Sequence, residues 1–189
     1  MRLAMATTLV FVLGCGGKKA PAGGAFADVE AKVAEVNAKV PASLAAPLTF
    51  KAARLDKERL GALLPDGWVE SPNLPGQFQP AGHSVRDGYL TRYAVGSNCD
   101  GACEATDWAT VVRSNEFDIP RGDVIKDEPL GTDGRILIKD QDGTLVVRLA
   151  RWKQGASRYF FCKVTLEADA RPAADAFEAA CRALTPLRW

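Results

Sequence analysis

The strongest secondary-structure signal in this chain is the segment GRILIKDQDGTLVVRLARWKQGASRYFFCKVTL, residues 134–166. It contains three stretches rich in β-branched and aromatic residues, 134–139, 144–152 and 158–166, separated by short polar loops. Such stretches favour strands, and short loops between them favour antiparallel hairpins. The segment therefore predicts a three-stranded antiparallel meander.

A helix is predicted directly after the meander, over residues 171–184. Pro172 fits the first turn of this helix, where a missing N–H costs nothing. Three apolar residues recur at helical spacing and share one face: Phe177, Cys181 and Leu184. This face predicts packing against the preceding strand, whose inward side chains would be Phe160, Cys162 and Val164.

Less regular patterns precede the meander. They predict a strand over 48–54, a helix over 56–64 beginning at Asp56, a Pro-rich loop over 71–82, a strand over 89–95 and a helix over 107–114 capped by Thr106. Together these elements predict an α+β fold, a curved antiparallel sheet flanked by helices, in a single domain over residues 48–189.

An amphipathic helix is predicted over residues 26–40. Its apolar stripe is spaced three and four residues apart: Phe26, Val29, Val33, Val36 and Val40. The stripe indicates packing on the domain, and a dimerisation helix is the alternative. Because residues 41–47 (PASLAAP) resemble a linker, we expect this helix to be dispensable for the fold of residues 48–189.

The amino terminus has the pattern of an export signal, with Arg2 before an apolar run over 3–13 that is too short to span a bilayer. The run ends in Val12-Leu13-Gly14-Cys15, which resembles the lipobox of bacterial lipoproteins. The resemblance implies a signal peptide over 1–14, acylation of Cys15 (palmitate among the acyl chains) and a flexible tether over 15–25. It implies a cell-envelope location, and Gly16 favours the outer membrane.

The composition is that of a folded domain: 189 residues, 47% of them hydrophobic, with 24 Lys and Arg against 23 Asp and Glu. A net charge of +1 excludes a general nucleic-acid binder, which would carry a basic excess. We expect the protein to contact the membrane through its N-terminal lipid.

Four cysteines remain beside Cys15, and an even number in an exported protein indicates disulfides. Cys99 and Cys103 flank a tight loop, while Cys162 and Cys181 lie on a strand and on the helix packed against it. We therefore predict the pairs Cys99–Cys103 and Cys162–Cys181. A Cys₄ zinc site and a redox-active Cys99/Cys103 pair are the alternatives, although neither pair has Cys-x₂-Cys spacing.

The order of elements resembles the Mog1/PsbP-like α/β/α sandwich. The resemblance rests on the Leu-Pro-Asp-Gly-Trp turn at 64–68, the late antiparallel meander and a closing helix of the form Ala-Phe-Glu-x-x-Cys-x-x-Leu. It implies a curved antiparallel sheet flanked by helices and selects no activity. The Cys-Asp-Gly-x-Cys loop at 99–103 also resembles an uncharacterised bacterial lipoprotein family.

No catalytic motif, cofactor motif or metal-ligand spacing stands out in the sequence. His83 is the only histidine, in a segment that reads as an exposed loop. Basic and aromatic residues alternate around one predicted hairpin and could bind an anion, a glycan or a peptide carboxylate: Arg148, Arg151, Trp152, Arg158 and Tyr159.

Two hypotheses for the function follow. The first is a non-enzymatic envelope lipoprotein that binds a protein or glycan partner or has a structural role. The alternative is an envelope hydrolase or another enzyme with a site around His83 and scattered carboxylates. A deep pocket holding His83 and two carboxylates would favour the enzyme.

Overall fold

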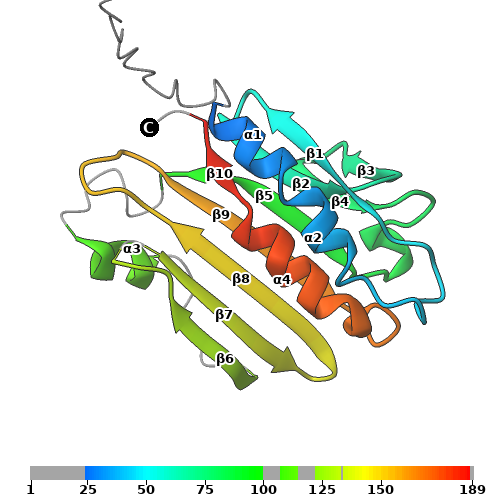
Figure 1. Cartoon of the computed structure of the whole chain (residues 1–189). Coiled ribbons are helices and arrows are strands. Elements are labelled where there is room, and N and C mark those ends of the chain that lie inside the picture. Colours follow the sequence, from blue (N-terminus) through cyan, green and yellow to red (C-terminus); the bar gives the residue numbers. More distant parts are fainter. Residues whose placement is uncertain (1–23, 100–106, 115–121, 133, 188–189) are drawn as a thin grey trace, which may run out of the picture.

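The computed structural model describes residues 24–99, 107–114, 122–132 and 134–187. The predicted meander is confirmed as β7 (Gly134–Gln141), β8 (Thr144–Arg151) and β9 (Tyr159–Leu166), paired antiparallel (Figure 1). Asp142 and Gly143 connect β7 to β8 with φ of 52° and 86°. Two positive φ values are what the two-residue turn of a twisted hairpin requires, so Gly follows Asp here.

The meander forms the middle and one side of a seven-stranded antiparallel sheet. Its strand order is β3-β4-β5-β9-β8-β7-β6. Four strands of this sheet do not belong to the meander: β3 (Trp68–Ser71), β4 (Leu74–Pro80), β5 (Arg92–Asn98) and β6 (Asp123–Pro129). A second antiparallel sheet has the order β1-β2-β10, from β1 (Phe50–Leu55), β2 (Leu60–Pro65) and β10 (Thr185–Pro186).

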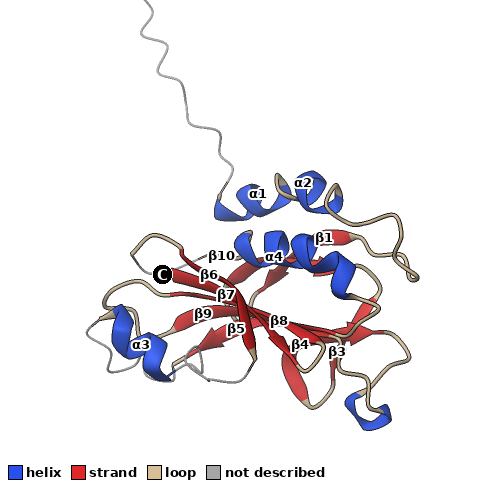
Figure 2. Ribbon diagram, turned by 90° about the horizontal axis from the view of Figure 1, so that it is seen from below, coloured by secondary structure: helices blue, strands red, loops and turns tan. Residues whose placement is uncertain are grey.

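Helices cover both faces of the large sheet (Figure 2). The closing helix is confirmed as the 3₁₀ turn η2 (Arg171–Ala173) followed by α4 (Ala174–Arg182), which contacts β8, β9 and β2. On its outer side lie α1 (Ala25–Glu30) and α2 (Val33–Asn37), and α3 (Trp108–Ser114) covers the opposite face of the sheet. A 3₁₀ turn, η1 (Val85–Asp87), lies between β4 and β5.

The main core fills the space between the large sheet, α4 and β2. Phe177 of α4 lies at its centre, with ring centroids 5.1–5.7 Å from Phe50, Trp68 and Tyr93. Every residue of β2 is buried, because the strand lies between β1 and β10 within this core. A smaller apolar cluster on the opposite face joins Val111 of α3 to β7, β8 and the start of β9.

The amphipathic segment 26–40 belongs to the main core. It forms two short helices instead of one, yet Val29 and Val36 are 0% and 1% exposed. The prediction that the stripe packs on the domain is therefore confirmed. The expectation that this segment is dispensable has lost its basis, because its side chains complete the core of residues 48–187.

Two predicted elements are wrong. Residues 56–59 form a turn and 60–65 form β2, although their composition suits a helix. Pairing with β1 and β10 outweighs that local preference, since it buries Leu60, Leu63 and Leu64. The predicted loop over 71–82 contains β4, whose Pro75 and Pro80 lie near its two ends and leave the middle of the strand free to pair.

The other boundaries shift slightly. β5 begins at Arg92 instead of residue 89. The helix predicted over 107–114 is confirmed as α3. Asp107 caps it, because its Oδ1 accepts a hydrogen bond from the N–H of Thr110 at 2.7 Å. Thr106, the predicted cap, lies outside the described residues. Residues 1–23, which include the predicted signal peptide, Cys15 and most of the tether, also lie outside. Within the described ranges, none of the helices is long and apolar enough to cross a bilayer.

Candidate functional site

The five basic and aromatic residues predicted as one binding face do not share a face. Trp152 and Tyr159 are 2% and 6% exposed and belong to the small cluster beneath α3. Arg148 lies on that same face of β8, whereas Arg151 alternates with Val147 and Leu149 on the face toward α4. Residues three apart on a strand point to opposite sides, and this two-residue period was already visible in the sequence.

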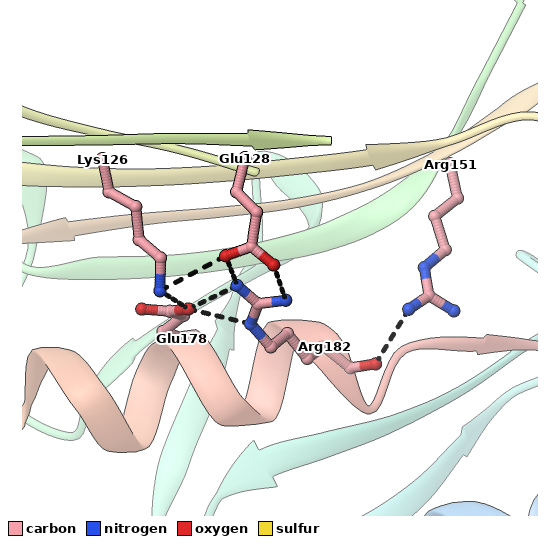
Figure 3. Close-up of polar contacts among 5 residues, drawn as sticks. All are labelled: Lys126, Glu128, Arg151, Glu178 and Arg182. Atoms are coloured by element: carbon pink, nitrogen blue, oxygen red, sulfur yellow. Dashed lines mark hydrogen bonds and ion pairs between the residues drawn. The ribbon is translucent and has the colours of Figure 1, made fainter. Parts of the chain in front are cut away.

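Arg151 binds the carboxyl end of α4. Its guanidinium donates to the backbone carbonyl oxygen of Arg182 at 3.3 Å, where the helix leaves carbonyl groups without partners (Figure 3). Burial and the nearby charge of Arg182 lower the pKa of Arg151. The residue therefore has a structural contact that accounts for its position.

Beside Arg151, four charged residues join the edge strand β6 to α4 (Figure 3). Lys126 donates to Glu178 at 2.6 Å, and Arg182 donates to both Glu178 and Glu128 at 2.7 Å. The hydrogen bond from Arg182 is the largest cause that lowers the pKa of Glu128. Burial raises the pKa of Glu178, but hydrogen bonds from Lys126 and Arg182 more than offset it, and the net shift is downward.

Arg158 lines a cleft of about 430 Å³ between the β1–β2 turn and the β8–β9 loop. We call it the basic cleft, defined by Lys57, Arg59, Ser97 and Arg158. Arg158 donates to the hydroxyl of Ser97 at 3.0 Å and to its carbonyl oxygen at 2.9 Å. The Glu58 carboxylate accepts from the N–H and the hydroxyl of Ser97 at 2.9 and 2.6 Å. Ser97 thus holds Arg158 in place.

His83 lines a second cavity of about 420 Å³, which we call the His83 pocket. Its walls come from residues 44–48, from the turn at 66–68, from the segment between β4 and β5 and from residues 169–177. Apolar groups predominate, with the aromatic rings of Trp68, Tyr89 and Phe177 among them. The imidazole of His83 stacks on Tyr89 with 4.1 Å between ring centroids.

Some of the polar groups that line this pocket already form hydrogen bonds with other residues. Asp66 accepts from Nζ of Lys51 at 2.6 Å, and this hydrogen bond is the largest cause that lowers its pKa. Burial raises the pKa of Tyr89. The pocket brings His83 together with two carboxylates, Asp66 and Asp169. Nonetheless, within the described part of the chain the imidazole of His83 forms no hydrogen bond.

Sequence reasoning placed His83 on an exposed loop, and its side chain is indeed exposed. It did not find the pocket, because residues 44–48 and 169–177 are far apart in the chain and were assigned to a linker and a helix. The Leu-Pro-Asp-Gly-Trp turn was the one signal: it contributes Asp66, Gly67 and Trp68 to the wall.

One of the two predicted disulfides lies within the described residues. Cys162 of β9 and Cys181 of α4 are bonded, with 5.5 Å between their Cα atoms. The prediction that the closing helix is covalently joined to the preceding strand is confirmed. The pair Cys99–Cys103 stays a prediction, because Cys103 lies outside the described residues.

Comparison with known proteins found no matching family model and no matching curated protein. Among solved structures, the Ran-binding protein Mog1p of Saccharomyces cerevisiae is similar over 75% of this chain and 97% of its own, with 9% identity and a TM-score of 0.47. A Mog1 variant matches 74% of this chain and 96% of its own, with 9% identity and a TM-score of 0.49. A Bacteroides thetaiotaomicron protein matches 71% and 47%, with 13% identity and a TM-score of 0.40.

Proposed function

We propose that this chain is a lipid-anchored binding protein of the bacterial cell envelope. Cys15 carries the lipid, residues 16–24 form the tether, and the folded domain presents the His83 pocket to a ligand. The lipobox-like residues Val12-Leu13-Gly14-Cys15 support the anchor. The His83 pocket is the observation that supports binding.

The pocket has the character of a ligand site. Its volume of about 420 Å³ falls within the range of small-molecule sites, and such sites combine apolar walls with a few polar groups. Here the apolar wall includes Trp68 and Phe177, while Thr91 and Asp169 supply polar atoms. The ligand class that fits is an amphiphilic molecule or a partner side chain with an apolar body and a polar end.

A hydrolase that uses His83 is the second candidate, because Asp66 and Asp169 line the same pocket. The observed contacts favour binding instead. Asp66 is held by Lys51, and within the described residues the imidazole of His83 forms no hydrogen bond with Asp66 or Asp169. His83 is therefore not oriented by a carboxylate in the way that a general base requires.

The anchor is tested by labelling cells with a fatty-acid analogue. The chain with Cys15 should be labelled and the Cys15→Ala variant should not. Normal labelling of Cys15→Ala would contradict the lipoprotein proposal.

The pocket is tested by blocking it. Ala81 is an exposed residue of its wall, so Ala81→Trp should fill the opening without disturbing the core. Ala109→Trp, at an exposed position of α3 away from the pocket, is the matched control. Native mass spectrometry of protein purified from its own envelope should find a bound molecule on the original chain and on Ala109→Trp, and lose it on Ala81→Trp. Ester hydrolysis by the original chain that disappears in His83→Ala would instead favour the hydrolase.

A further inference from the structure

The basic cleft lies at the end of the domain where the tether enters. The guanidinium of Arg54, on β1, lies 4.4 Å above the ring of Phe26 in the first turn of α1. The carbonyl of Arg59, in the next turn, accepts from the N–H of Leu187 at 2.8 Å. Figure 1 accordingly shows the start of α1, the β1–β2 turn and β10 at the same end of the molecule.

Three cations line this cleft without a carboxylate partner. Within the described residues, Lys57, Arg59 and Arg158 form no ion pair, and all three are exposed. Among the described residues that line the cleft, Glu58 is the one acidic group, and its carboxylate accepts hydrogen bonds from Ser97. The guanidinium of Arg158 is oriented by its two hydrogen bonds to Ser97. A guanidinium held in place in the same cleft as two further unpaired cations is suited to a phosphate group.

The length of the tether places this cleft near a bilayer. Nine residues, 16–24, follow Cys15 before α1 begins, and they extend to at most about 30 Å when fully stretched. Lys18 and Lys19 in that segment add positive charge between the anchor and the cleft. Cations held this close to a membrane surface attract anionic lipids.

We propose that the basic cleft binds the phosphate of an anionic phospholipid headgroup in the membrane that holds Cys15, and so fixes which end of the domain faces the bilayer. This inference depends on the proposed lipid anchor. The His83 pocket, which is lined by different residues, is then left accessible to its ligand.

Hydrogen exchange of the acylated full chain in lipid nanodiscs tests the proposal. The N–H groups of Glu58, Arg59 and Ala156 are hydrogen-bonded in the two loops of the cleft, so their exchange is measurable. In discs of phosphatidylcholine mixed with phosphatidylglycerol, exchange in both loops should slow about tenfold relative to discs of phosphatidylcholine alone, as expected when a ligand is present at ten times its Kd. The segment between β4 and β5 should show no change.

Matched charge variants make the test specific. The double variant Lys57→Ala, Arg158→Ala should lower the apparent affinity for phosphatidylglycerol about 30-fold. Lys39→Ala with Arg86→Ala removes the same charge from exposed positions outside the cleft and should leave it unchanged. Lys57→Ala alone should give a partial loss of the phosphatidylglycerol effect. It replaces the double variant if the Arg158 change unfolds the protein, because within the described structure the Lys57 side chain forms no hydrogen bond that would be lost.

Three results would overturn the proposal. Protection by inorganic phosphate in neutral discs, as strong as that by phosphatidylglycerol, would assign the cleft to a free phosphate. Absence of protection, with acylation of Cys15 verified by mass, would reject the headgroup site and leave the lipid anchor intact. A mass showing Cys15 without lipid would reject the proposed function, and with it the membrane placement of the cleft.

Discussion

The side chain of Asn37 pairs with the backbone of Phe50 as a neighbouring strand would. Its Nδ2 donates to the Phe50 carbonyl oxygen at 3.0 Å, and its Oδ1 accepts from the Phe50 N–H at 2.7 Å. Asn37 is the last residue of α2 and Phe50 the first of β1. This pair connects the N-terminal helices to the sheet at the edge strand of the smaller sheet.

We predict that Asn37→Ala lowers the free energy of unfolding by about 2 kcal/mol, since two hydrogen bonds of about 1 kcal/mol each are lost at a partly buried site. The change should appear as a lower urea midpoint with an unchanged slope. Lys39→Ala, two residues away and exposed, is the control and should have no effect. An Asn37→Ala midpoint equal to that of the original chain would show that these two hydrogen bonds add nothing to the stability of the fold.

A second prediction concerns Tyr93, which is fully buried beside Phe177. Among the described residues its hydroxyl finds no hydrogen-bond partner, and burial raises its pKa. An unsatisfied buried hydroxyl costs about 1–3 kcal/mol, so Tyr93→Phe should leave stability unchanged or raise it. A fall in the urea midpoint of this variant would mean that an ordered water satisfies the hydroxyl.

The parts of the fold that could be predicted are those in which one local pattern is sufficient. Alternating side chains in β7, β8 and β9, together with the short loops between them, were enough to give the meander. The face of α4 that carries Phe177 and Cys181 could be identified from helical spacing, and with it the disulfide to Cys162.

The rest depends on contacts between distant segments. Residues 60–65 pair along their whole length with the neighbouring β1, but their burial also depends on α4 and on β10, which pairs with Leu60 and Gly61; both lie more than 100 residues later. The strand β6 was missed because its sequence DVIKDEP is charged, which suits the edge of a sheet. Both cavities are lined by segments that are remote in sequence, so neither could be recognised before the fold was known.

A third prediction concerns acid stability. The pKa of Glu178 is lowered in the folded protein. The folded protein therefore binds a proton at Glu178 less tightly than the unfolded chain does. Its contribution to stability is therefore complete above its ordinary pKa of 4.5 and is lost as the pH falls through the lower, folded value. Glu178→Gln should cost about 2 kcal/mol at neutral pH, because its contacts with Lys126 and Arg182 lose their charge.

Urea titrations at several pH values check this prediction. The difference in unfolding free energy between the original chain and Glu178→Gln should shrink below pH 4.5. Asp175→Asn, an exposed change on the same helix, is the control. A difference that stays constant down to low pH would show that Glu178 acts through packing and not through its charge.

The last prediction concerns the bond between Cys162 and Cys181, which joins β9 to α4 across 19 residues of sequence. In the unfolded chain, a loop of this length loses entropy worth about 3 kcal/mol when it is closed. The double variant Cys162→Ala, Cys181→Ala loses that restriction, and the loss of two buried sulfur atoms leaves a gap beneath α4.

The predicted Cys99–Cys103 bond would close a much shorter loop, so its removal should cost about 2 kcal/mol or less. The Cys162/Cys181 variant should therefore show the lower urea midpoint. The opposite order would mean that the segment after β5 carries more of the stability than α4 does, and would make Cys99 and Cys103 candidates for a functional site.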